Sequence, residues 1–142
     1  MEQTFSQHWK SSKSPRKQRK YRYNAPLHIK RKFLAAHLSK DLIKKYARRS
    51  VIVRKGDRVL VMRGSFKKKT AKVTRVDIKQ ELVYLEGVEF TKKDGNKVQL
   101  GVHPSNLTIT ELVTDDKYRL ESLNKNVKKD KTDKSAAKGV SK

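Results

Sequence analysis

The apolar residues of this 142-residue chain lie mainly between positions 51 and 113, in short runs of at most four residues, as in Val59–Met62. Short runs rich in Val, Ile and Leu at close spacing are typical of β-strands, whereas a membrane-spanning helix needs about 20 apolar residues. A domain of about 60 residues buries only some 60% of its unfolded surface and is marginally stable. We therefore expect one small β core, which the binding of a partner would stabilise further.

Charge is the second constraint on the chain. It contains 37 Lys and Arg residues and 14 Asp and Glu residues, for a net charge of +23. A folded protein with this charge repels itself unless a polyanion balances it, so nucleic acid is the expected partner. The N-terminus also has no apolar segment of the signal-peptide type, so we expect the protein to stay in the cytoplasm.

The sequence lacks the residue patterns that catalysis, metal binding and cofactor binding require. The absence of Cys excludes disulfides, thiolate zinc sites and Cys nucleophiles. The acidic residues are scattered among Lys and Arg, no phosphate-binding loop or dinucleotide fingerprint occurs, and no metal-ligand spacing connects the four histidines, which are His8, His28, His37 and His103. We therefore expect no catalytic residue, metal, cofactor, small-molecule substrate or membrane span.

Charge and apolar content together divide the chain. Residues 1–50 carry a net charge of +13, residues 51–113 carry +6 and residues 114–142 carry +4. The first 25 residues have no apolar periodicity and cannot bury enough surface to offset the entropy of ordering. We expect an extended basic arm over residues 1–25, a short helical segment over 26–50, a small barrel over 51–113, and a short helix with a flexible basic tail over 114–142.

Local signals place the short helices. Pro26 suits the first position of a helix, and Ser39 can cap a second helix, with Leu38 stapled against Ile43. The spacing of the apolar residues after Asp116 predicts a helix up to Val127 with three partly covered side chains, which are Tyr118, Leu120 and Leu123.

The central region is predicted to form about five short strands, which suggests a small barrel. Turn signals separate them, most clearly Lys93-Asp94-Gly95-Asn96. Six Val and Leu side chains are assigned to the core, namely Val59, Val61, Val73, Val76, Val83 and Leu85. The expected strands are Arg58–Arg63, Lys72–Asp77, Glu81–Glu86 with the adjoining Gly87–Thr91, Lys97–Val102 and Asn106–Leu112.

The segment from Val53 to Val73 resembles the KOW motif, a strand–loop–strand module of about 27 residues in RNA-associated proteins. Gly56-Asp57 suits the turn before a strand, and Gly64 permits a positive φ in the loop. Three consecutive lysines, Lys67–Lys69, then form an exposed tip that phosphates can approach. The sequence departs from the motif at Lys68 and Ala71, where such modules usually have glycine.

The flanks of this motif resemble one family in particular. Pro15–Tyr21 and Asn24–His28 are similar to the N-terminal arm of the KOW-domain large-subunit ribosomal protein numbered twenty-four in bacteria and archaea and twenty-six in eukaryotes. Leu38–Leu42, and Val102–Ile109 after the core, resemble later parts of its archaeal and eukaryotic branch. The resemblance implies an SH3-like barrel and a non-enzymatic role in the ribosome. It further implies binding to the first domain of large-subunit ribosomal RNA near the peptide-tunnel exit, support of early assembly, and contacts with neighbouring ribosomal proteins.

RNA contact is assigned to three groups of residues. The arm can pair phosphates and stack bases, because tyrosines alternate with cations; the alternative is a solvated tail or a targeting signal. For the loop lysines the alternative is a solvated tip, and for the residues after Val102 it is a structural turn. The predicted RNA-binding residues are Arg16, Lys17, Arg19, Lys20, Tyr21, Arg22, Tyr23, His28, Lys30, Arg31, Lys32, Arg48, Arg49, Arg63, Gly64, Ser65, Lys67, Lys68, Lys69, Lys72, His103, Ser105 and Asn106.

Rival interpretations belong to other classes of protein. A KOW-type transcription elongation factor would bind polymerase, but such factors usually have a separate α/β domain before the KOW module, for which this chain has no room. A DNA-architectural protein would bind duplex DNA and ribosomal RNA equally well. An RNA-modifying enzyme would need a cofactor site, and no motif for one occurs.

Overall fold

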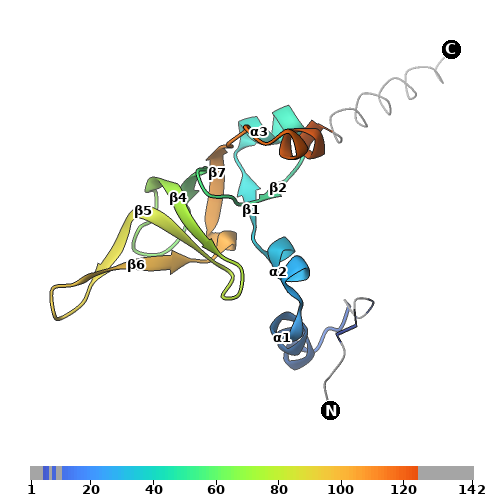
Figure 1. Cartoon of the computed structure of the whole chain (residues 1–142), viewed down its shortest axis with the longest axis horizontal. Coiled ribbons are helices and arrows are strands. Elements are labelled where there is room, and N and C mark those ends of the chain that lie inside the picture. Colours follow the sequence, from blue (N-terminus) through green and yellow to red (C-terminus); the bar gives the residue numbers. More distant parts are fainter. Residues whose placement is uncertain (1–4, 7, 9–10, 125–142) are drawn as a thin grey trace.

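The computed structural model describes residues 5–6, 8 and 11–124, and it is dominated by one seven-stranded sheet (Figure 1). The strand order is β2-β1-β7-β3-β4-β5-β6, and every neighbouring pair is antiparallel except β1 with β7. The strands are β1 (Ala35–Leu38), β2 (Ser50–Ile52), β3 (Arg58–Val61), β4 (Thr70–Asp77), β5 (Leu82–Thr91), β6 (Lys97–Val102) and β7 (Leu107–Glu111). The helices are α1 (Pro15–Asn24), α2 (Leu27–Phe33), α3 (Lys40–Tyr46), the 3-10 helix η1 (Pro104–Asn106) and the helical residues 117–124. The fold is therefore mixed α/β, with the predicted β core.

The core lies where the apolar runs predicted it. Val59 and Val61 of β3, Val73 of β4, and Val83 and Leu85 of β5 are buried, and Val76 is half-buried against them. Alternation along β3 and the first half of β4 places every second side chain inward, as the period of two in a strand requires. The alternation in β4 ends after Val73, where the register with β5 shifts. The prediction of these core residues is confirmed.

Two strands were missed, β1 within the segment that was expected to be helical and β2 at the boundary between that segment and the predicted barrel. β1 lies between α2 and α3 in the chain. It pairs with β2, where Ala36 opposes Val51, and on its other side with β7. β1 and β2 have only four and three residues, so neither shows a detectable alternation by itself. Ala36 and Leu38 are nevertheless fully buried, and long-range pairing with β7 makes this segment a strand.

The segment over residues 15–24 is helical, and the expectation of an extended arm is wrong there. α1 begins with Pro15 at its first position, where the fixed φ favours a helix and the missing N–H is not needed. None of its residues is buried, so its sequence carries no apolar periodicity that could have indicated a helix. Tyr21 contacts the rings of Phe5 and Phe33, with ring centroids 4.8 and 6.4 Å apart, and these contacts orient the helix.

The adjoining segments Glu81–Glu86 and Gly87–Thr91, which no turn signal separates, belong to one strand, β5. Gly87 has a φ of +67°, and the register with β6 shifts between Tyr84 and Glu89. A bulge of this kind bends a strand without ending it. The β5–β6 hairpin consequently projects from the body of the sheet (Figure 1).

The start positions of α2 and α3 lie close to those predicted from the sequence. α2 begins at Leu27, one residue after Pro26, which is its N-cap. Ser39 caps α3 by accepting a hydrogen bond from the Leu42 amide, at 3.4 Å. These boundaries are set by neighbouring residues in the chain, which explains why the sequence indicated them.

The C-terminal helix is held by a buried ion pair that the sequence analysis missed. Asp57, expected to be only a turn residue, is 0% exposed, and Arg119 is 5% exposed. Arg119 donates to both Asp57 carboxylate oxygens at 2.7 Å and to the Val113 carbonyl at 2.9 Å. Leu123 of this helix is also buried, whereas Tyr118, expected to be partly covered, is 81% exposed. The predicted end of this helix and the predicted tail lie beyond residue 124, outside the described residues.

Candidate RNA interface

The loop between β3 and β4 presents its cations on a turn with defined backbone geometry. The Lys68 amide donates to the Val61 carbonyl at 2.8 Å, and the Lys67 amide donates to Gly64 at 3.1 Å. Gly64 has a φ of +91° and Lys68 a φ of +69°. Lys68, a departure from the usual glycine, thus keeps the left-handed backbone that glycine favours. Its side chain and that of Lys67 are exposed.

Phe66 anchors the same loop to the body of the protein. Its ring is half-buried against the core, and the Lys69 ammonium lies 5.6 Å from the ring centroid. Lys69 also donates to the Gly87 carbonyl at the β5 bulge. Ala71, the other departure from the motif, is a buried residue of β4, where a small side chain fits and no positive φ is needed.

The η1 turn lies next to this loop. The Met62 amide, at the start of the loop, donates to the Asn106 carbonyl at 2.8 Å. His103 caps η1, because its Nδ1 accepts from the Ser105 amide at 3.3 Å and lies 2.8 Å from the Ser105 hydroxyl. The structure therefore brings the two predicted groups together at one end of β3 and β7.

A polar cluster connects the end of α1 to η1. Arg22 donates to the Glu81 carboxylate, and its guanidinium lies 3.5 Å from His103 Nε2. Glu81 has a positive φ of +58° in the β4–β5 turn. Arg22 is thus paired within the chain, and the sequence analysis missed Glu81 because 59 residues separate it from Arg22.

The other predicted residues on the two N-terminal helices lie mostly on the protein surface. All of the predicted side chains on α1 are exposed except Tyr21, which is half-buried. Tyr23 is solvent-facing, and the Lys30 ammonium lies 6.0 Å from its ring. The predicted residues on these two helices are Arg16, Lys17, Arg19, Lys20, Tyr21, Arg22 and Tyr23 on α1 and His28, Lys30, Arg31 and Lys32 on α2.

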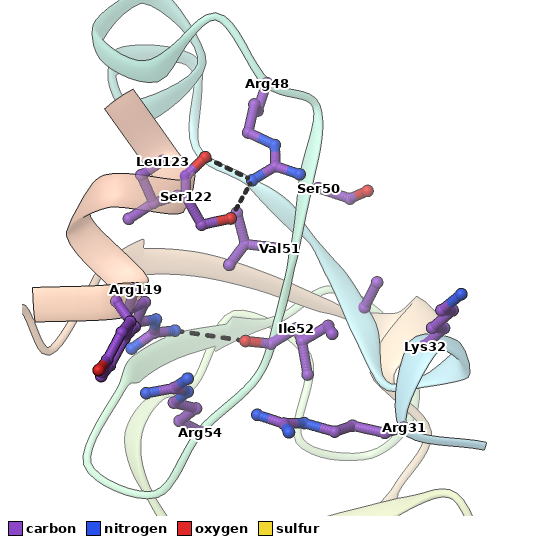
Figure 2. A pocket seen from close by; sticks show the side chains of 12 residues that line it. Arg31, Lys32, Arg48, Ser50, Val51, Ile52, Arg54, Arg119, Ser122 and Leu123 are labelled. Carbon is purple, nitrogen blue, oxygen red and sulfur yellow. Dashed lines mark hydrogen bonds between the residues drawn. The ribbon is translucent and has the colours of Figure 1, made fainter. Parts of the chain in front are cut away.

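A second group of cations surrounds a hollow of about 410 Å³ between β2, α2 and the C-terminal helix (Figure 2). Arg48 reaches into it and donates to the Ser122 carbonyl at 3.2 Å and to the Ser122 hydroxyl at 3.4 Å. Arg31 and Lys32 line it from α2. We call it the Arg48 hollow.

Two predicted residues lie apart from both groups. Arg49 is an exposed residue just before β2, and it is not among the described residues that line the Arg48 hollow. Lys72 pairs in register with Arg58 and lines a separate shallow hollow with Glu111.

Arg54 is a further cation of the Arg48 hollow that the sequence analysis missed. It donates to Asp116, and this guanidinium is the main reason why the pKa of Asp116 lies below its ordinary value of 3.8. Its position beside Lys55 in the motif was the only available signal. No helix of the described chain is long and apolar enough to cross a bilayer, and its His, Asp and Glu side chains do not form groups of three that could hold a metal ion.

Comparison with known proteins decides the family. Residues 12–126 match the ribosomal protein family that comprises eukaryotic L26 and its archaeal equivalent. The chain belongs to this family. It is 47% identical to the large ribosomal subunit protein uL24 of Methanosphaera stadtmanae over 116 residues, which are 82% of this chain and 99% of that protein. The proteins of the same name from Methanosarcina barkeri and Methanocella arvoryzae are also 47% identical, covering 80% of this chain and 98% and 91% of theirs.

The family confirms the main expectations about the class of protein. It is a family of large-subunit ribosomal proteins, so the prediction of a structural, non-enzymatic protein of the cytoplasmic ribosome is confirmed. The matched range also includes α1 and the C-terminal helix.

Proposed function

We propose that this chain binds the first domain of large-subunit ribosomal RNA near the peptide-tunnel exit and supports early assembly of the subunit. The observation that carries the proposal is the cationic end built from the β3–β4 loop, η1 and α1. Between Arg63 and Lys72 the chain has five cations and no acidic residue, and the loop backbone is fixed by its own hydrogen bonds. Such a preformed set of cations suits folded RNA, which is recognised largely by shape and by its phosphates.

The three RNA-binding groups have distinct roles in this proposal. Lys67 and Lys68 contact phosphates, and the His103–Asn106 turn lies against the same RNA helix. The exposed face of α1 extends along a neighbouring RNA segment, and neighbouring ribosomal proteins cover part of the remaining surface. We also propose that the sheet curls into an SH3-like barrel over residues 51–113. Core side chains come from both β1 and β5, which lie far apart in the strand order, and this supports the barrel.

The test is binding of the full chain to an RNA fragment of the first domain, compared with an equally long fragment of another domain and with duplex DNA. We expect preference for the first-domain fragment and a log–log salt slope of about −0.7 to −0.9 for each phosphate contacted. Lys67→Gln/Lys68→Gln should make the slope shallower by about two such units. Equal affinity for duplex DNA would favour a DNA-architectural protein instead, and stable binding to purified polymerase would favour an elongation factor.

A further inference from the structure

The Arg48 hollow adjoins a second hollow, and cations separate the two. The second hollow, of about 610 Å³, extends from α2 toward the β4–β5 turn and is lined by Arg75, which lies 4.2 Å over the Tyr84 ring. We call it the Arg75 hollow. Arg31, Ile52 and Arg54 line both hollows and therefore form the boundary between them. Figure 2 shows the Arg31 side chain extending from α2 toward Arg54.

Positive charge at this boundary is only partly balanced within the chain. Seven Lys and Arg residues line the two hollows. Of these seven, only Arg54 and Arg119 form salt bridges with described residues, namely Asp116 and Asp57. Within the part of the chain that the structure describes, neither hollow is lined by an Asp or Glu residue. Because Arg31 extends toward Arg54 (Figure 2) and forms no salt bridge with a described residue, an anion seated between these two side chains would be favoured.

The hollows on either side of this boundary have apolar floors. Val51 and Leu123 contribute to the Arg48 hollow, and Val76 and Ile78 contribute to the Arg75 hollow. The ring of Tyr118 borders the Arg48 hollow and is free to stack, because it is almost fully exposed. Each volume lies within the range of small-molecule sites. In a dinucleotide, one phosphate lies between two nucleosides. The cations at the boundary could bind this phosphate, and the apolar side chains of each hollow could contact one nucleoside.

We propose that the two hollows bind one unpaired dinucleotide step of RNA, with its phosphodiester between Arg31 and Arg54 and one nucleoside in each hollow. The inference rests on the proposed RNA-binding function, but it assigns a separate site with its own recognition. This site reads a single-stranded step, whereas the cationic end of the loop and η1 contacts folded RNA. The C-terminal helix is part of the site, because Tyr118 and Ser122 form one wall of the Arg48 hollow.

The test uses the ¹⁵N-labelled full chain, titrated with the dinucleoside monophosphate ApA, with AMP, with adenosine and with inorganic phosphate. We expect ApA to shift the amide resonances of Val51 and Val76, at the two hollows, and to bind about tenfold more tightly than AMP. Arg31→Gln should weaken ApA binding about tenfold. Arg58→Gln, which removes the same charge from an exposed arginine outside both hollows, should leave it unchanged. Unfolding midpoints of both variants establish that they are folded.

Results that differ from these expectations would contradict specific parts of the inference. Equal binding of AMP and ApA would mean that the site takes a free mononucleotide. Equal losses in Arg31→Gln and Arg58→Gln would mean nonspecific attraction by the net charge. If the chain binds the first-domain RNA fragment but ApA shifts neither hollow, the inference fails while the proposed function stands. If the chain does not bind that fragment, the proposed function fails whatever ApA does.

Discussion

Replacement of Arg119 with Met should destabilise the protein far more than loss of any exposed arginine. Arg119 donates to both Asp57 oxygens at 2.7 Å and to the carbonyls of Val113 and Ile52 at 2.9 and 3.3 Å. Without it, Asp57 keeps only the backbone amides of Arg54 and Val113, at 2.8 and 3.0 Å. Removal of one partner of a buried pair leaves an uncompensated charge and costs about 3–5 kcal/mol. This is a large part of the 5–15 kcal/mol that stabilises a typical domain.

The assay is urea unfolding of the full chain, followed by far-UV circular dichroism. With an m-value of about 1.5 kcal/mol/M, a loss of about 3 kcal/mol lowers the midpoint by about 2 M. Asp57→Asn should cause a similar loss, because it leaves the Arg119 charge buried. The double variant Asp57→Asn/Arg119→Met should lose much less than the sum of the two single losses, because neither buried charge remains.

The matched control is Arg58→Met. Arg58 pairs with Glu111 at 3.0 Å, but both side chains are more than half exposed, and such pairs contribute about 0–1 kcal/mol. If Arg119→Met loses no more stability than Arg58→Met, or if the two losses in the double variant are additive, the buried pair does not hold the C-terminal helix and our reasoning is refuted.

Two further predictions concern the loop and the C-terminal segment. In urea unfolding, the Lys68→Gly variant should be about 1 kcal/mol more stable than the Lys68→Ala variant. Both variants lose the same charge, but only glycine removes the steric strain of a φ of +69°. Equal stabilities of the two variants would contradict the left-handed backbone at residue 68. The pKa of Asp116 is lowered by Arg54, so the Asp116 carboxylate should titrate below 3.8 by NMR and shift upward in Arg54→Gln. A carboxyl whose pKa is lowered on folding contributes stability above its unfolded pKa and loses it as pH falls through the folded value. The contribution of the wild-type pair should therefore be lost only as the pH falls below 3.8. An unchanged titration of Asp116 in Arg54→Gln would contradict this account of the pair.

Features that depend on near neighbours in the chain could be predicted from the sequence alone. The short runs of Val and Leu in β3, β4 and β5 predicted the buried core, because such runs are typical of strands that pack against one another. Ser39 predicted the start of α3, since a cap acts within three residues. Net charge predicted a polyanionic partner, and the motif with its flanks pointed to the ribosomal family that the comparisons then established.

Features that join distant parts of the chain became visible only in the folded protein. β1 is a strand because β7, some 70 residues away, pairs with it, and α1 has no buried face that a pattern could reveal. Asp57 becomes a buried ion-pair partner only because Arg119 lies beside it in the fold, although 62 residues separate them. Arg31 and Arg54 likewise come together from α2 and the segment after β2. Contacts between residues so far apart in the sequence depend on the packing of the whole chain, so a local sequence pattern cannot predict them.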